Sequence, residues 1–177
     1  MHTVFLIIGK SGAGKDTIVK ELCNRYGYKR LISYTTRPRR YEGEDTHTFI
    51  TEAEYEAHRD AGDIVAYTFY NGNHYFATMG QLYESDLYVI DPAGVEYLKE
   101  RAKHINLIGI YLDIDSTGQM VRMLKRGDRF DQAVRRIQND KEAFQTIDPQ
   151  WHIVNACDDP ENLISKINKL MQKHLTN

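Results

Sequence analysis

Residues 3–16, TVFLIIGKSGAGKD, decide the fold of this 177-residue chain. Their first half is a continuous apolar run, the pattern of a strand buried on both faces of a parallel sheet. Their second half, Gly9-Lys10-Ser11-Gly12-Ala13-Gly14-Lys15, matches G-x-x-x-x-G-K, and apolar residues at helical spacing follow over 17–26. A strand, a glycine-rich loop and a helix in this order predict a phosphate-binding loop.

This loop can bind phosphate mainly through its backbone. Its glycines let successive N–H groups face one concavity, and the following helix adds the positive end of its dipole. We expect every residue from Gly9 to Thr17 to contribute to an ATP site, with Lys15 reaching the β and γ phosphates. Asp16 and Thr17 follow the lysine where Ser or Thr usually comes first, and we expect both to bind Mg²⁺ through oxygen atoms.

Outside the loop, short apolar or β-branched stretches alternate with helical patterns. Strands are expected at 31–34, 64–70, 75–78, 87–90, 105–112 and 152–155, and helices at 95–102, 117–126, 132–143 and 161–174. Thr51 and Glu54 form a capping box that starts a further helix, and Asn71-Gly72-Asn73 is a hairpin turn.

The alternation predicts an α/β fold, a P-loop three-layer α/β/α domain with a parallel sheet core. We treat the chain as a single domain, 1–177, with its core at about 1–32 and 79–177. A small inserted β-rich lobe is expected at about 33–78, and a short helical segment at about 126–136.

The composition excludes several classes of protein. The net charge of −2 argues against nucleic-acid binding, and the seven histidines show no zinc-ligand spacing. The absence of a long apolar run or a signal-peptide pattern argues against a membrane protein. Two distant cysteines favour a reducing, cytoplasmic setting, and we expect no obligate protein partner.

Basic residues are concentrated in two segments, 29–40 and 122–136. In the first, Ser33-Tyr34-Thr35-Thr36-Arg37-Pro38-Arg39-Arg40 has hydroxyls before two arginines spaced by three. Guanidinium forks bind phosphate oxygens bidentately, so this segment predicts a second phosphate site.

The phosphate loop followed by S-x-T-T-R-x-x-R resembles the guanylate kinase family, and the resemblance runs nearly end to end. Residues 71–75 resemble the GN-x-Y hairpin of that family, and Asp91-Pro92-Ala93-Gly94 its Asp-x-x-Gly. Residues 122–127 resemble its R-L-x-x-R-G segment, and residues 134–137 its later I-x-x-R-L segment.

This resemblance implies an ATP- and Mg²⁺-dependent kinase that phosphorylates a nucleoside monophosphate. By the same resemblance, the lobe at about 33–78 would bind the acceptor and the segment at about 126–136 would be a short helical lid. The acceptor would be bound by Ser33, Thr36, Arg37, Arg40, Glu44, Tyr75 and Asp91. The catalytic residues would be Lys15, Arg37, Arg122, Arg126 and Arg136. Such a reaction depends on alignment and charge neutralisation, so we nominate no general base.

The chain departs from this family where guanine would be read. The family has an acid six residues before the hairpin glycine, and this chain has Ala66. His47 stands where the family has Tyr, and Phe76 where it has Gly. We therefore expect a weak preference for GMP, which Ala66→Glu should strengthen unless Glu44 or Asp91 supplies the missing hydrogen bonds.

Two other functions stay open. One is a kinase similar to ribose 1,5-bisphosphate kinases, or one for another small phosphorylated acceptor, because a sugar phosphate needs no base-reading acid. The less favoured one is a non-catalytic binding module similar to guanylate kinases. Such modules typically lose the phosphate loop, which this chain keeps.

Overall fold

The core of the protein is a sheet of four parallel strands in the order β6-β1-β7-β8. The computed structural model describes residues 1–176, and Asn177, the last residue of the expected domain, lies outside them. The strands are β1 (Thr3–Gly9), β6 (Leu87–Val89), β7 (Asn106–Asp113) and β8 (His152–Asn155). Because β1 lies between two neighbours and under helices on both faces, its continuous apolar run is fully buried.

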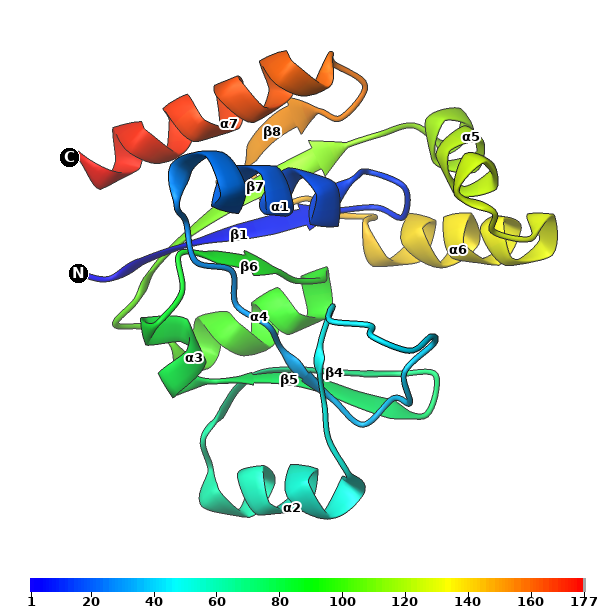
Figure 1. The fold of residues 1–177 in the computed structure, drawn as a ribbon. Coiled ribbons are helices and arrows are strands. Elements are labelled where there is room, and N and C mark those ends of the chain that lie inside the picture. The colour runs from blue at the N-terminus through cyan, green and yellow to red at the C-terminus, as the bar shows by residue number, and fades with distance from the viewer. Residues whose placement is uncertain (177) are drawn as a thin grey trace.

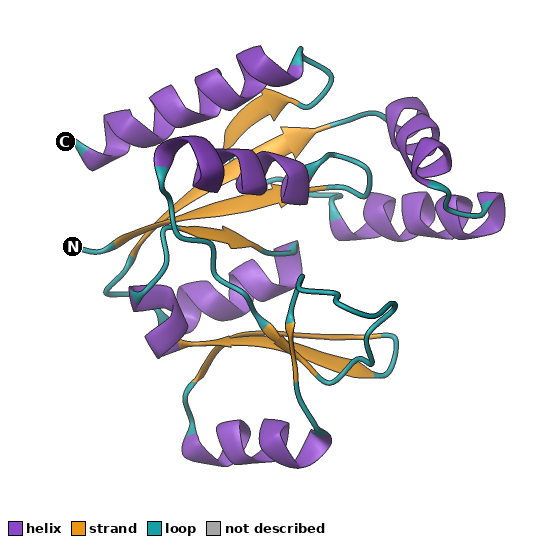
Figure 2. Cartoon of the chain, in the orientation of Figure 1, coloured by secondary structure: helices purple, strands orange, loops and turns teal. Residues whose placement is uncertain are grey.

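Helices cover both faces of this sheet and give the three expected layers (Figures 1 and 2). The helices α1 (Lys15–Tyr26) and α7 (Pro160–Leu175) cover one face. The helices α3 (Met79–Tyr83) and α4 (Pro92–Arg101) cover the other. Alternate β1 side chains point to opposite layers, since Phe5 packs with the α1–α7 cluster and Leu6 with the α4 cluster.

A second sheet lies beyond α4, in the order β3-β2-β5-β4. Its strands are β2 (Tyr34–Thr35), β3 (Thr48–Phe49), β4 (Ile64–Tyr70) and β5 (Asn73–Thr78). The helix α2 (Glu52–Ala61) packs on it through Tyr55 and begins at the Thr51 capping box expected from the sequence. Asn71 and Gly72 both have positive φ, 49° and 74°, which is what a two-residue hairpin turn between β4 and β5 requires.

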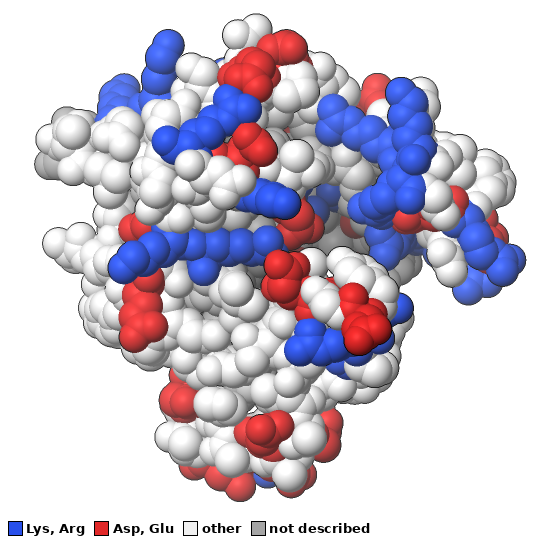
Figure 3. Space-filling view, in the orientation of Figure 1, with Lys and Arg blue, Asp and Glu red and all other residues white. Residues whose placement is uncertain are grey.

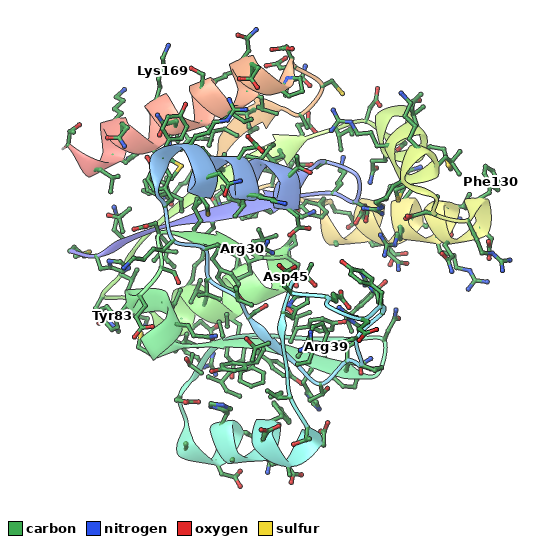
Figure 4. All side chains as sticks on the ribbon, viewed as in Figure 1. Arg30, Arg39, Asp45, Tyr83, Phe130 and Lys169 are labelled. Atoms are coloured by element: carbon green, nitrogen blue, oxygen red, sulfur yellow. The ribbon has the colours of Figure 1, made fainter. Side chains whose placement is uncertain are left out.

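The helices α5 (Ser116–Arg126) and α6 (Phe130–Ala143) form an arm at the end of the core sheet where β1 runs into its loop (Figure 1). Phe130, labelled in Figure 4, lies at the outer end of this arm and is 65% exposed. The arm is longer than the lid expected at 126–136, which covers only the turn and the first half of α6.

One short strand differs from expectation. The sequence predicts a strand at 31–34, and the structure has β2 at Tyr34–Thr35. The reason is that residues 30 and 31 bond to the edge of the core sheet: Arg30 forms an isolated parallel bridge with Leu87 of β6, and Leu31 N donates to Leu87 O at 2.7 Å. Within residues 1–176, no helix combines the length and the apolar character that crossing a membrane requires.

Candidate active site

The phosphate loop joins β1 to α1 at the carboxyl end of the core sheet. Two of its glycines are required by space and by backbone conformation. A Cβ on Gly9 would lie 2.9 Å from Leu112 O, and Gly12 has a φ of 77° and lies against the backbone of Gln119. The loop is therefore packed directly against β7 and α5, and larger side chains at these two positions would displace it.

Lys15 lies inside this loop and holds it closed. Its Nζ donates to Gly9 O at 2.6 Å and to Lys10 O at 3.1 Å. Burial lowers the pKa of Lys15 from its ordinary value, and the nearby carboxylates of Asp16 and Asp140 oppose part of this shift. A bound polyphosphate would add strong negative charge next to the ammonium group and favour its charged form.

Three side chains of the α5–α6 arm bind the backbone of the phosphate loop. Arg122 donates to Gly12 O and Ala13 O, both at 3.3 Å, and to Ala156 O at 2.6 Å. Gln119 and Asp140 bind Ser11, as described below. The Arg122 guanidinium is therefore occupied by carbonyl oxygens behind the loop.

The segment expected to clamp a phosphate is folded around a buried carboxylate. Glu44 is 1% exposed and accepts hydrogen bonds from Arg37 at 2.8 and 3.2 Å, from Arg40 N at 2.7 Å and from Thr46 Oγ1 at 2.9 Å. The hydrogen bonds from Arg37 and Arg40 N hold the pKa of Glu44 at about 2. Glu44 thus organises the clamp and has little capacity left for a ligand.

The two arginines of the clamp are placed differently. Arg40 lines a cavity together with Ser33 and Tyr75. Arg37 is 11% exposed, pairs with Glu44 and lies 5.2 Å from the Phe49 ring centroid. Thr36 uses its hydroxyl to accept from His74 N at 3.0 Å, which joins the clamp to the hairpin. The residues brought together at the cavity are thus Ser33, Arg40 and Tyr75, with Arg37 behind them.

His47 is a cavity residue that the sequence did not assign to the site. Its Nδ1 lies 3.0 Å from Ser33 Oγ, and its ring meets that of Tyr75 edge-on at 5.5 Å. Burial, with the positive charges of Arg37 and Arg30, lowers the pKa of His47 to about 4, so it is neutral at pH 7. The sequence contained one indication, since His47 stands where the family has Tyr, but this difference alone did not suggest a function for His47.

The cavity has a volume of about 550 Å³ and lies between the core, the second sheet and α6. Figure 3 shows a hollow on this face, with Lys and Arg side chains along the edge formed by the arm. From the phosphate loop it is lined by Gly9, Ser11 and Lys15; from the second sheet by Ser33, Arg40, His47, Tyr67, Thr68, Tyr70 and Tyr75; from β6 and α4 by residues 88–94; and from the α6 side by Arg136, Asn139, Asp140, Ala143 and Phe144. One cavity therefore joins the expected donor loop to the expected acceptor clamp.

Ala66 does not belong to this cavity, and the expectation that it marks the base-reading position is wrong for this structure. It is 0% exposed and belongs to the core cluster that contains Val95 and Leu98 of α4. Ala66 pairs with Ala77, and Thr68 pairs with Tyr75 two residues along the same face. Counting six residues back from the hairpin glycine therefore finds the correct face of β4. At Ala66 this face is covered by α4, and Thr68 is the residue of this face that lines the cavity.

Asp91 lies at the cavity, as expected, and also begins a helix. Its Oδ1 accepts from Gly94 N at 2.8 Å as the N-cap of α4, and from Thr68 Oγ1 at 3.1 Å. Asp16, the expected metal ligand, pairs with Arg30 at 2.7 Å, and its side chain is 64% exposed. Arg30, labelled in Figure 4, lies below α1 and was not assigned to the site from the sequence.

Of the expected lid arginines, Arg136 lines the cavity and Arg126 does not. Both pair with Asp128, Arg126 at 2.6 Å and Arg136 at 3.6 Å. The hydrogen bond from Arg126 holds the pKa of Asp128 below its ordinary value. Arg136 is therefore the one of these two arginines that lines the cavity, although the positive charges of both act on Lys15.

Comparison with known proteins gives one family. The model of the guanylate kinase family matches residues 1–174. The guanylate kinase of Thermotoga maritima is 32% identical over 161 residues, which are 85% of this chain and 77% of that protein. The guanylate kinase of Mycoplasma genitalium is 28% identical over 165 residues, 85% of this chain and 68% of the relative. The crystal structure of the guanylate kinase from Anaplasma phagocytophilum superposes with a TM-score of 0.68 at 17% identity, covering 98% of this chain and 86% of that one.

Proposed function

The chain belongs to the guanylate kinase family and is a nucleoside monophosphate kinase, and we propose that it transfers the γ-phosphoryl group of ATP to GMP or a similar nucleotide. The observation that carries this proposal is the single cavity whose walls include Lys15 on one side and Ser33, Arg40 and Tyr75 on the other. In-line transfer needs the donor and the acceptor phosphate next to each other in one site, and this cavity joins the residues proposed for each.

Each part of the cavity has a task in this reaction. The backbone N–H groups and Lys15 bind the β and γ phosphates, and the start of α1 adds positive potential. Arg40, Ser33 and Tyr75 orient the acceptor phosphate, while Arg37 holds the clamp in shape through Glu44. Arg136 approaches the transferring group from α6 and neutralises the charge that develops on it. Arg122 supports the backbone of the loop, and Arg126 adds positive charge near Lys15.

The oxygen ligands after Lys15 fit Mg²⁺. This ion usually keeps several waters and is bound through one or two carboxylates together with substrate phosphates. Asp16 offers one carboxylate beside the loop, and it uses one oxygen on Arg30. With Thr17 it would hold the hydrated ion, which supplies charge neutralisation for the phosphates when bound.

For the acceptor, the family implies GMP, and we propose that the acidic side chains at the cavity limit how strongly guanine is preferred over other bases. The acidic side chains that line the cavity are Asp91 and Asp140. Asp91 Oδ1 already accepts two hydrogen bonds, so only part of its carboxylate is available to accept N–H groups of guanine. The cytoplasmic setting and the lack of a protein partner stay predictions.

A panel of acceptors tests the proposal. ADP formation from ATP and Mg²⁺ would be measured with GMP, dGMP, AMP, UMP and ribose 1-phosphate, and also with ribose 1,5-bisphosphate. Turnover with GMP at least equal to the other nucleotides, lost in Lys15→Ala while the protein stays folded, supports the proposal. Lys20→Ala, which removes an exposed lysine on α1, is the matched control. Turnover only with a sugar phosphate would contradict this proposal and favour a kinase similar to ribose 1,5-bisphosphate kinases.

A further inference from the structure

Both backbone groups of Ser11, in the phosphate loop, are bound by side chains of the α5–α6 arm. Ser11 N donates to Asp140 Oδ2 at 2.7 Å, and Ser11 O accepts from Gln119 Nε2 at 3.1 Å. Gln119 Nε2 also donates to Asp140 Oδ2 at 2.6 Å, and Gln119 is 1% exposed. These three residues form a closed set of hydrogen bonds that fixes the Ser11 peptide units and the helix α6 together.

This set lies on the wall of the cavity that the loop shares with the clamp. Ser11, Lys15 and Asp140 line the same cavity as Ser33 and Arg40 of the clamp. In the proposed reaction the γ-phosphoryl group is the part of ATP that travels toward that clamp. The Ser11 N–H therefore belongs to the γ end of the phosphate site.

Backbone N–H groups of such a loop donate to phosphate oxygens, but the Ser11 N–H donates to the Asp140 carboxylate. Asp140 also interacts electrostatically with the Lys15 ammonium, which is the second group that a γ-phosphate would contact. A γ-phosphate bound at the Ser11 N–H would repel the Asp140 carboxylate, since both are anions in a partly buried site. Both cannot accept the Ser11 N–H at once.

We propose that Asp140 is a positioning residue that competes with the γ-phosphoryl group for the Ser11 N–H and leaves Ser11 when ATP binds. Arg136 lies four residues earlier on α6, hence on the same face, and also lines the cavity. Departure of Asp140 frees α6 from the loop, and the arriving phosphate attracts Arg136. One movement of α6 thus exchanges a negative charge for a positive one beside the transferring group.

The inference rests on the proposed donor role of ATP and makes a prediction that acceptor assays do not test. Asp140→Asn keeps an oxygen for Ser11 N and Gln119 and removes the charge that repels phosphate. Its affinity for ATP should rise about tenfold, because the neutral amide binds the Ser11 N–H more weakly than the carboxylate does and no longer repels the γ-phosphate. Its affinity for ADP should rise by less than about twofold, because ADP lacks the γ-phosphate. Glu142→Gln, which removes an exposed charge from the same helix, should leave both affinities unchanged.

Titration calorimetry with Mg²⁺ and either nucleotide, without acceptor, measures these affinities, and circular dichroism melting verifies that each variant is folded. Asp140→Ala serves as a second variant, because it also frees the Ser11 N–H and should favour ATP over ADP even if the loop is less ordered. An unchanged ratio of ATP to ADP affinity in both variants would overturn the inference while leaving the kinase function intact. If the wild-type protein binds no ATP, the proposed function and the inference both fail.

Discussion

Replacing Glu44 by Gln should loosen the acceptor clamp and lower the stability of the whole protein. The side chain is 1% exposed and accepts four hydrogen bonds, two of them from Arg37. Glutamine has one accepting oxygen, and its amide N–H groups would face the Arg37 guanidinium. Arg37 would then be left nearly buried without a counter-charge.

The size of the effect follows from this environment. Removing one partner of a buried ion pair costs about 3–5 kcal/mol, and glutamine keeps part of the hydrogen bonding, so we expect about 3 kcal/mol. For a domain of this length that loss lowers Tm by about 6–12 °C. Because Arg37 and Arg40 are both held by this carboxylate, the KM for the acceptor should rise while the KM for ATP changes little.

The pH dependence has a defined sign. Since the folded state lowers the pKa of Glu44 to about 2, its carboxylate stabilises the fold above the ordinary glutamate pKa of about 4.5. That contribution is lost as pH falls from about 4.5 toward about 2. The difference in stability between wild type and Glu44→Gln should therefore shrink over this interval.

Thermal denaturation followed by circular dichroism between pH 3 and pH 7, together with acceptor and ATP kinetics at pH 7, measures these effects. Glu42→Gln, at an exposed position in the same loop, is the matched control and should behave as wild type. A Glu44→Gln protein with unchanged Tm and unchanged acceptor KM would refute the reasoning, because the buried pair would then contribute nothing to the clamp.

Three further predictions concern the expected metal ligand, the acceptor clamp and position 66. Asp16→Ala should raise the Mg²⁺ concentration needed for half-maximal turnover, and an unchanged requirement would make Asp16 only a partner of Arg30. Arg40→Ala should raise the KM for the acceptor at least tenfold with little change in the KM for ATP. The exposed control Arg129→Ala should change neither KM. An equal rise in both KM values for Arg40→Ala would contradict two separate phosphate sites. Ala66→Glu should lower Tm strongly, since it buries a carboxylate beneath α4; a stable protein with a new preference for GMP would show that position 66 reaches the base.

The elements that sequence reasoning predicted correctly are those with local signals. The buried strand β1 was identified by an apolar run, the phosphate loop by its glycines, and the start of α2 by the Thr51 capping box. The hairpin followed from Asn71-Gly72, where positive φ is needed. Each signal depends on residues within a few positions of one another, so no knowledge of distant contacts was required.

The partners of the charged residues could not be found in this way. The residues around Arg37 in the sequence do not show whether its guanidinium binds phosphate or pairs with Glu44. The contact between Asp140 and Ser11 joins residues 129 positions apart. The sequence counted Ala66 onto the correct face of a strand, but whether α4 or open cavity covers that face is a tertiary property. The sequence by itself determined the glycine-rich loop between β1 and α1 and the layered fold, because backbone conformation and apolar periodicity are local. The packing of separate elements decided which charged side chains are free to meet a substrate, because charged groups pair with whatever folding brings near them.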